Sequence, residues 1–310
     1  MRAVFFGTPQ VAVPALRALT QVAEVSGVVC QPDRPSGRGL KVSAPPVKEA
    51  ALELGLSVHQ PTKVRTGALA EWLREQRADV AVVMAYGRIL PADVLSAARR
   101  GAMNLHASLL PGYRGAAPIN WVIVNGEPRS GISLMQMDEG LDTGPVYSRH
   151  ALDLTETETA GTLAERIATL GAHVVRADLA AAVDGKLKAE PQDEALASHA
   201  PLIERRHLQV DWGRSALDIA RLVRGMAPRP GAFTLLGGKV FRIHEARPVQ
   251  GPMPSGALPG TLSILGKRAL IATGSGTLEL ISAQLEGKKA LMAVDLINGR
   301  VLVESLVLGS

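Results

Sequence analysis

The stretch Met1-Arg2-Ala3-Val4-Phe5-Phe6-Gly7-Thr8-Pro9 begins the chain with a short apolar run that ends at a glycine and a proline. Such a run predicts a buried strand at Ala3–Phe6, and the helical pattern Val13–Val22 follows it. Further runs of both kinds alternate over the first half: strands at Val25–Cys30, Asp79–Ala85, Met103–Ala107 and Ile132–Met137, and helices at Pro46–Leu54 and Ala68–Arg77. This alternation predicts an α/β domain with a doubly wound, mostly parallel sheet of the Rossmann type.

The second part of the chain has a different pattern. A helix is expected at Ser215–Met226, followed by short strand-like runs with glycine-rich turns. These runs are Ala232–Leu236, Val240–Ile243, Gly260–Ile264, Ala269–Thr273, Thr277–Ala283 and Val301–Val303. Many short strands with such turns predict a smaller OB-like β-barrel. We therefore expect a catalytic domain over 1–189, a linker over 190–206 and a barrel domain over 207–310.

Composition excludes several classes of protein. The 310 residues carry a net charge of +5, which favours an anionic partner without establishing one. Cys30 is the only cysteine, so no intrachain disulfide can form, and its place at the end of an apolar run predicts a small buried side chain. There is no signal-peptide pattern, no apolar run of about 20 residues and no CxxC or HExxH metal motif. We expect a cytoplasmic protein without a membrane span or a metal.

The first turn argues against a dinucleotide cofactor. Phe6-Gly7-Thr8-Pro9 holds only one of the glycines of the G-x-G-x-x-G fingerprint. A doubly wound sheet can form without binding such a cofactor.

Two polar residues end one of the predicted strands. Asn104 and His106 are two apart, so on a strand both side chains point to the same face. An amide and an imidazole can both donate hydrogen bonds to a developing oxyanion. The alternative is a satisfied buried histidine beside a turn-forming asparagine.

A glycine-rich loop follows the next predicted strand. Met135–Gly144 carries Asp138 and Asp142. A loop carboxylate near a histidine and an asparagine would complete an acid–base site that needs no metal. The alternative is an Asx turn, which is common where Asp precedes a glycine.

A third segment, Gln31–Lys41, is rich in basic residues and glycine and lacks apolar anchors. We expect a mobile basic loop that could bind phosphates, with a solvated surface loop as the alternative. More basic residues lie in the second part of the chain: Arg205, Arg206, Arg221, Arg224, Arg229 and Lys239.

At these residues the chain resembles the methionyl-tRNA formyltransferase family. The resemblance covers nearly the whole chain. The motifs are Gly7-Thr8-Pro9, Gln31–Gly39, Met84-Ala85-Tyr86-Gly87, Asn104–Pro111, Arg114–Ile119, Met135–Gly144, Val210-Asp211-Trp212 and Pro230–Phe233. One departure is Arg229, which stands where the family usually has tryptophan.

The resemblance implies a role for each motif. Asn104, His106 and Asp142 would be the catalytic residues. Folate would bind at Ser108, Leu109, Leu110 and Pro111, and at Met84, Ala85, Tyr86 and Gly87. The tRNA would contact Arg34, Arg38, Lys41, Arg221, Arg224 and Arg229.

The implied reaction moves the formyl group of 10-formyltetrahydrofolate onto methionyl initiator tRNA, with the chain acting as a monomer. Three alternatives stay open: a formyltransferase for a small amine such as glycinamide ribonucleotide or an aminosugar nucleotide, a formyl-folate hydrolase, and a tRNA- or folate-binding module without catalysis.

Overall fold

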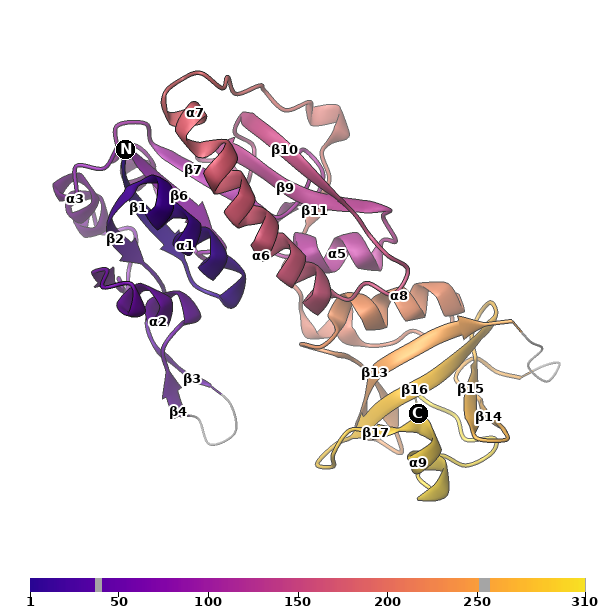
Figure 1. Cartoon of the computed structure of the whole chain (residues 1–310). Coiled ribbons are helices and arrows are strands. Elements are labelled where there is room, and N and C mark those ends of the chain that lie inside the picture. Colours follow the sequence, from indigo (N-terminus) through magenta and orange to yellow (C-terminus); the bar gives the residue numbers. More distant parts are fainter. Residues whose placement is uncertain (37–40, 251–256, 310) are drawn as a thin grey trace. The chain divides into compact units, whose positions relative to one another are not determined.

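The computed structural model describes residues 1–36, 41–250 and 257–309 (Figure 1). The chain forms two compact units. The first contains residues 1–118, 129–153 and 164–201, and the second contains residues 119–128, 154–163 and 202–310.

A seven-stranded sheet forms the first unit, in the order β10-β9-β7-β6-β1-β2-β5 (Figure 1). Its strands are β1 (Arg2–Gly7), β2 (Glu24–Val29), β5 (Val58–His59), β6 (Val80–Met84), β7 (Ala102–His106), β9 (Arg129–Gln136) and β10 (Val146–Asp153). From β5 to β7 all neighbours are parallel, whereas β9 runs antiparallel to β7 and to β10. The prediction of a mostly parallel sheet is confirmed.

Helices cover both faces of this sheet (Figure 1). They are α1 (Val13–Val22), α2 (Pro46–Glu53), α3 (Ala68–Glu75), α4 (Ala92–Leu95), α6 (Ala160–Ala177) and α7 (Leu179–Val183). On one face, Leu69 and Leu73 of α3 pack with Val4 and Phe6 of β1. On the other face, α1 and α6 are joined where Arg176 donates to Gln21 at 3.4 Å. The doubly wound arrangement follows, because parallel strands buried on both sides need a layer on each.

The edge strand β10 was not predicted from the sequence. Its residues alternate between buried or half-buried and exposed positions, and they include Arg149 and His150. A strand at the edge of a sheet leaves part of one face in water, so it lacks the apolar run that marked the central strands.

The basic segment contains a short antiparallel hairpin, β3 (Arg34–Ser36) with β4 (Lys41–Ser43). A polar anchor holds its base: Asp33 pairs with Lys48 at 2.7 Å and accepts from Gln60 at 2.8 Å. These hydrogen bonds hold the pKa of Asp33 below its usual range. The segment thus has a polar anchor at its base, its expected mobility stays a prediction, and Arg38 lies outside the described residues.

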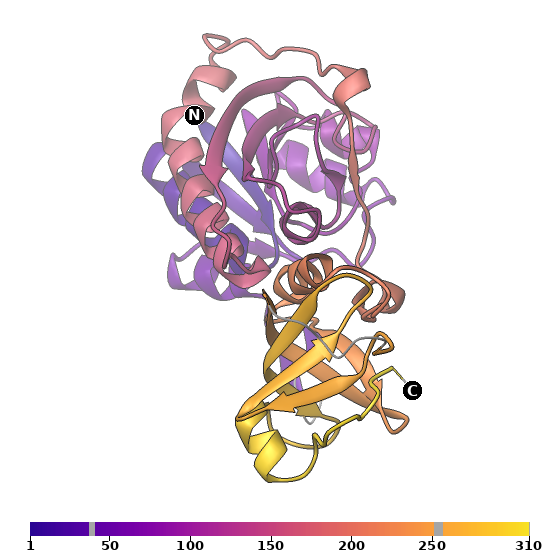
Figure 2. The same cartoon turned by 90° about the vertical axis from the view of Figure 1, so that its right-hand side faces the viewer.

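The second unit is an antiparallel β domain (Figures 1 and 2). Its strands are β12 (Ala232–Leu236), β13 (Lys239–Val249), β14 (Leu262–Leu265), β15 (Arg268–Ala272), β16 (Thr277–Leu285) and β17 (Leu291–Met292), in the order β12-β13-β16-β15-β14 with β17 also on β16. Its helices are α5 (Pro118–Val124), α8 (Ala216–Met226) and α9 (Ala293–Asn298). Figure 2 shows the twist of this sheet, with α9 beside its lower end.

Sequence signals and packing agree for most of this unit. Ser215 caps α8 by accepting from the Asp218 amide at 3.1 Å, and Ile219, Val223 and Met226 join the core of the unit. The predicted strand Val301–Val303 is wrong, since the segment forms turns in which Leu302 is buried. Burial explains the apolar character of Leu302 but not that of Val303, which is exposed.

Residues 190–200 hydrogen-bond within the first unit. Glu190 bridges to Val146, and β11 (His199–Ala200) pairs in parallel with β8 (Arg114–Gly115). The last stretch of the first unit ends at Pro201. The expected domain boundaries at 189 and 207 stay predictions.

In the part of the chain that the structure describes, no helix is both long enough and apolar enough to cross a membrane.

Cys30 is fully buried, and burial raises the pKa of its thiol to about 11. Since the thiolate is the reactive form, we expect no labelling of the folded protein by a thiol reagent near pH 8 and one label per chain in denaturant. A Cys30→Ser variant is the control, because it removes the only thiol. Rapid labelling of the native protein would contradict the buried position.

Candidate active site

Two polar side chains are buried at the carboxyl end of β7. Asn104 and His106 are 9% and 5% exposed. Their strand lies between β6 and β9, where Asn104 is opposite Met135 and His106 is opposite Ser133. Buried polar groups need hydrogen-bond partners, so the surrounding loops decide what these side chains can do.

The loop after β9 brings a carboxylate to them. Asp138 makes the predicted Asx turn, accepting from the Gly140 amide at 3.1 Å and the Thr143 hydroxyl at 2.8 Å. Asp142 has a φ of 55°, a left-handed conformation that few residues other than glycine adopt. Of the two aspartates, Asp138 shapes the loop and the Asp142 carboxylate contacts the side chains of β7.

Asp142 contacts both polar residues of β7. Its Oδ1 lies 3.4 Å from the Asn104 amide nitrogen, and its Oδ2 lies 3.5 Å from His106 Nδ1. Oδ2 also accepts from the Gly115 main-chain amide at 2.8 Å. The three side chains that the sequence singled out therefore meet at one point.

The second ring nitrogen fixes the tautomer of His106. Nε2 lies 2.9 Å from the main-chain oxygen of Tyr113. A carbonyl oxygen can only accept, so Nε2 carries a hydrogen. Nδ1 then faces Asp142 with a lone pair in the neutral ring and with a hydrogen in the imidazolium.

A buried arginine stands behind this loop. Arg114 is 3% exposed and forms a two-pronged pair with Glu194, at 2.9 and 2.7 Å. Glu194 raises the pKa of Arg114, and the same hydrogen bonds lower the pKa of Glu194. The guanidinium also interacts electrostatically with Asp142.

Gln192 links Arg114 to the loop. Its Oε1 accepts from Arg114, and its amide nitrogen donates to the main-chain oxygens of Asp142 and Gly144, both at 2.7 Å. Sequence reasoning missed Gln192, Glu194 and the role of Arg114. Only the Arg114–Ile119 motif pointed to this region, since the partners lie 78 and 80 residues apart in sequence.

The predicted folate segment after His106 is a tightly bonded turn. Ser108 donates its hydroxyl to the Gly112 oxygen at 2.6 Å, and Leu110 packs with Met135 and Val146. Ser133 joins the turn to β9: its hydroxyl donates to Ser108 O at 2.7 Å and accepts from Leu110 N at 3.0 Å. The Ser108 hydroxyl and the Leu110 side chain are thus engaged within the protein.

The other predicted folate segment is the turn after β6. Ala85 and Gly87 have φ values of 50° and 78°. The Thr8 hydroxyl donates to the main-chain oxygen of Tyr86 at 3.0 Å, and the Gln31 side-chain amide donates to the same oxygen at 2.9 Å. The Tyr86 ring is buried edge-on against Phe6, and this burial raises its pKa to about 12. Main-chain groups are therefore what this turn could offer a ligand.

The basic residues predicted to contact tRNA differ in their surroundings. Arg34 donates to Gln31 at 2.9 Å. The Arg221 guanidinium is 3.8 Å from the Asp218 carboxylate. The Arg224 guanidinium donates to the main-chain oxygen of Glu158 at 3.1 Å. Burial lowers the pKa of Arg224. Arg229 is exposed. The side chain of Lys41 is not among those described.

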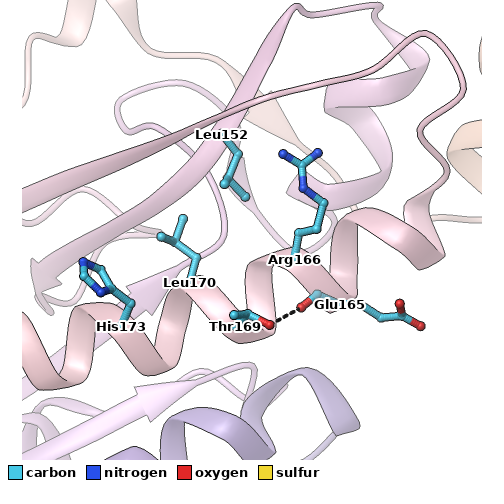
Figure 3. Close-up of a pocket in the computed structure, with 6 residues that line it drawn as sticks. All are labelled: Leu152, Glu165, Arg166, Thr169, Leu170 and His173. Atoms are coloured by element: carbon cyan, nitrogen blue, oxygen red, sulfur yellow. Dashed lines mark hydrogen bonds between the residues drawn. The ribbon is translucent and has the colours of Figure 1, made fainter.

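An open depression of about 410 Å³ lies between α6 and β10 (Figure 3). Its lining consists of Leu152, Glu165, Arg166, Thr169, Leu170 and His173. None of them is a predicted site residue, and Arg166 and His173 already contact Asp153 and His150. This depression is a groove between a helix and a strand. We do not take it as the active site, because the polar groups that converge on one point lie at the end of β7.

Across the described residues, no group of three or more His, Cys, Asp or Glu side chains is placed to hold a metal ion.

Comparison with known proteins defines the class. Residues 1–178 match the formyl transferase family, and residues 202–301 match the formyl transferase C-terminal domain. The fold is shared with an N-formyltransferase from Helicobacter canadensis, in complex with folinic acid and dTDP-3-aminofucose (TM-score 0.68, 15% identity, 90% of this chain and 98% of that one). It is also shared with HypX from Aquifex aeolicus in complex with tetrahydrofolic acid (TM-score 0.64, 17% identity, 98% of this chain). The chain spans 48% of the length of HypX.

Two curated relatives are much more similar. The methionyl-tRNA formyltransferase of Sorangium cellulosum is 53% identical over 310 residues, which is 100% of both chains. That of Myxococcus xanthus is 46% identical over 302 residues, covering 97% of this chain and 96% of the relative. The chain belongs to the methionyl-tRNA formyltransferase family.

Ser133 is expected to stabilise the turn that follows β7. It is fully buried, and Ser133→Ala would leave the Leu110 amide and the Ser108 oxygen each without this partner. We expect the free energy of unfolding in urea to fall by about 1–3 kcal/mol. The control is Ser96→Ala, where an exposed hydroxyl bonds to Ala92, and a change within about 0.5 kcal/mol is expected there. Equal effects of the two substitutions would contradict this role.

Proposed function

We propose that this chain transfers the formyl group of 10-formyltetrahydrofolate to the α-amino group of methionyl initiator tRNA. The observation that carries the proposal is the meeting of Asn104, His106 and Asp142 at the end of β7. Full-length identity of 53% to a methionyl-tRNA formyltransferase supports the choice of substrates. Cytoplasmic location and a monomeric state stay predictions.

In this reaction the neutral methionyl amine attacks the formyl carbon. A carbon–nitrogen bond forms, and the carbonyl electrons move to the formyl oxygen. The Asn104 amide and the Nδ1 hydrogen of a protonated His106 are the two donors placed to stabilise that oxyanion. Nε2 is not available for this task, because it already donates to Tyr113.

Collapse of the intermediate breaks the bond between the formyl carbon and the folate nitrogen. The attacking amine must lose a proton, and the departing nitrogen must gain one. Asp142 lies against Nδ1 of His106, so it can accept the amine proton directly or through water. The protein returns to its starting protonation state once that proton has reached the folate nitrogen.

Two main-chain turns are proposed to hold the folate. The turns at Ser108–Pro111 and Met84–Gly87 follow the neighbouring strands β7 and β6. Carboxyl ends of parallel strands are where open α/β sheets place ligands. The Ser108 hydroxyl is bonded within its turn and the Tyr86 ring is buried against Phe6, so we assign binding of the pterin ring to the main-chain groups of both turns.

The basic residues are proposed to bind the tRNA. Arg34 and Lys41 belong to the strands of the hairpin, whose base is fixed through Asp33, and Arg38 lies between them in the sequence. Arg221, Arg224 and Arg229 belong to α8 and the segment after it. Contacts of this kind would bind phosphates by charge and position the acceptor end.

The direct test is formyl transfer from 10-formyltetrahydrofolate, with methionyl initiator tRNA, methionyl elongator tRNA, glycinamide ribonucleotide and water as competing acceptors. Selective formylation of the initiator is expected. Turnover on a small amine or on water, without transfer to tRNA, would overturn the proposed substrate.

Removing an oxyanion donor should slow the chemical step. We expect His106→Ala and Asn104→Ala each to lower kcat roughly a hundredfold or more, equivalent to about 2.7–4 kcal/mol. The matched control is His173→Ala on α6, which should keep wild-type turnover. Thermal unfolding of each variant separates lost chemistry from lost folding. Near-wild-type turnover of a folded His106→Ala protein would exclude the proposed role.

Arg38→Ala should weaken the use of tRNA and spare the folate. We expect a higher KM for tRNA, an unchanged KM for 10-formyltetrahydrofolate, and a salt slope of tRNA binding reduced by about one unit for each lost phosphate contact. Arg74→Ala, an exposed cation of α3, is the control. Identical tRNA kinetics and salt slopes for both variants would return the segment to a solvated surface role.

A further inference from the structure

We propose that Gln192 is a positioning residue that holds Asp142 in its reactive place through the main chain of the loop. The inference rests on the proposed function, because it assigns Gln192 a part in that same transfer. Gln192 lies 50 residues after Asp142, in the segment that leads towards Pro201.

All the hydrogen-bonding groups of the Gln192 amide are engaged. Its nitrogen donates at 2.7 Å to the main-chain oxygen of Asp142 and to that of Gly144. Its oxygen accepts from Arg114 Nε at 3.1 Å and from Nη2 at 2.9 Å. One side chain thus spans the loop on both sides of Thr143.

Arg114 decides which way the amide faces. A guanidinium has only donors, so the amide oxygen must face it and the NH₂ group must face the loop. Arg114 is itself fixed by its paired bonds to Glu194. These bonds link Glu194, Arg114 and Gln192 into a brace, and the Gln192 end of this brace is bonded to the loop.

The brace adds to the one short hydrogen bond that the Asp142 carboxylate makes, which it accepts from the Gly115 amide at 2.8 Å. A non-glycine residue in a left-handed conformation costs of order 1–3 kcal/mol unless its surroundings hold it. Asp142 has this conformation, and its carboxylate is 3.4 Å from Asn104 and 3.5 Å from His106. The bonds from Gln192 are shorter than these two contacts, and they hold the main-chain oxygens of Asp142 and Gly144, on either side of Thr143.

Loss of the brace should affect chemistry more than binding. If the loop relaxes, the carboxylate moves relative to His106, and a shift of about 1 Å can reduce turnover about a hundredfold. Substrate-binding groups elsewhere keep their places. We therefore expect kcat to fall about tenfold to a hundredfold in Gln192→Ala, with the KM of each substrate changed less than about twofold.

Gln192→Glu separates the two ends of the side chain. A glutamate keeps the length of the side chain and can accept hydrogen bonds from Arg114. Its carboxylate cannot donate to the main-chain oxygens of Asp142 and Gly144. We expect it to lose at least as much kcat as Gln192→Ala. Wild-type turnover of Gln192→Glu would overturn the inference, since the donors to the loop would then be dispensable.

A double-mutant cycle tests whether Gln192 acts through Asp142. In an Asp142→Asn background, Gln192→Ala should lower kcat less than about twofold, because the group that it positions has already lost its function. A loss as large as in the wild-type background would overturn the inference and assign Gln192 a merely structural role. Gln76→Ala, which removes a glutamine bond to the Trp72 carbonyl, is the control and should keep wild-type kcat.

Amide hydrogen exchange gives a readout that does not depend on activity. We expect exchange across residues 138–144 to be about tenfold faster in Gln192→Ala, with unchanged exchange in β1 and β6. If the wild-type chain formylates no tRNA, the proposed function fails. The rate of amide hydrogen exchange across residues 138–144 then still tests whether Gln192 holds the loop. If the wild-type chain is active but neither exchange nor kcat responds to Gln192→Ala, the positioning role fails by itself.

Discussion

The site depends on one carboxylate held in an unfavourable backbone conformation. Asp142 has a positive φ, yet its two oxygens face the amide of Asn104 and the imidazole of His106. Burying several polar groups together at the end of a strand costs free energy unless each group has a hydrogen-bond partner. The Gly115 amide, the Tyr113 carbonyl and the Gln192 amide supply those partners from outside the strand. The sheet provides the place, and the segments after β7 and β9, together with the segment that holds Gln192, provide the geometry.

Much of the fold could be predicted because its central strands are buried on both faces. Burial on both sides leaves an apolar run in the sequence, as at β1 and β6, and both were predicted within a residue or two. The edge strand β10 leaves no such run, since water reaches alternate residues. The mostly parallel sheet and a second unit built of β-strands are confirmed, whereas Val301–Val303 shows that apolar residues at a bend can imitate a strand.

The site was predictable only where its geometry is local. Asn104 and His106 share a face because a strand repeats every two residues, and the glycine-rich loop placed a carboxylate nearby. Nothing local distinguishes Gln192 from any other glutamine in a polar segment. Its role arises from contact with Arg114 and Asp142, which are 78 and 50 residues away. The roles of the individual residues stay predictions, although the structure brings the three side chains together.

The course of the chain after β10 also bears on how the protein could be divided or recombined. Residues 190–200 look like a spacer in composition, but they supply the glutamine that bonds to the acidic loop and the strand that pairs with β8. A catalytic fragment cut at 189 would leave that glutamine with the other piece, whereas a cut after Pro201 would keep it. Chimaeras that exchange residues 202–310 between homologous proteins should therefore be joined after Pro201, because an earlier junction would transplant part of the active-site scaffold along with them.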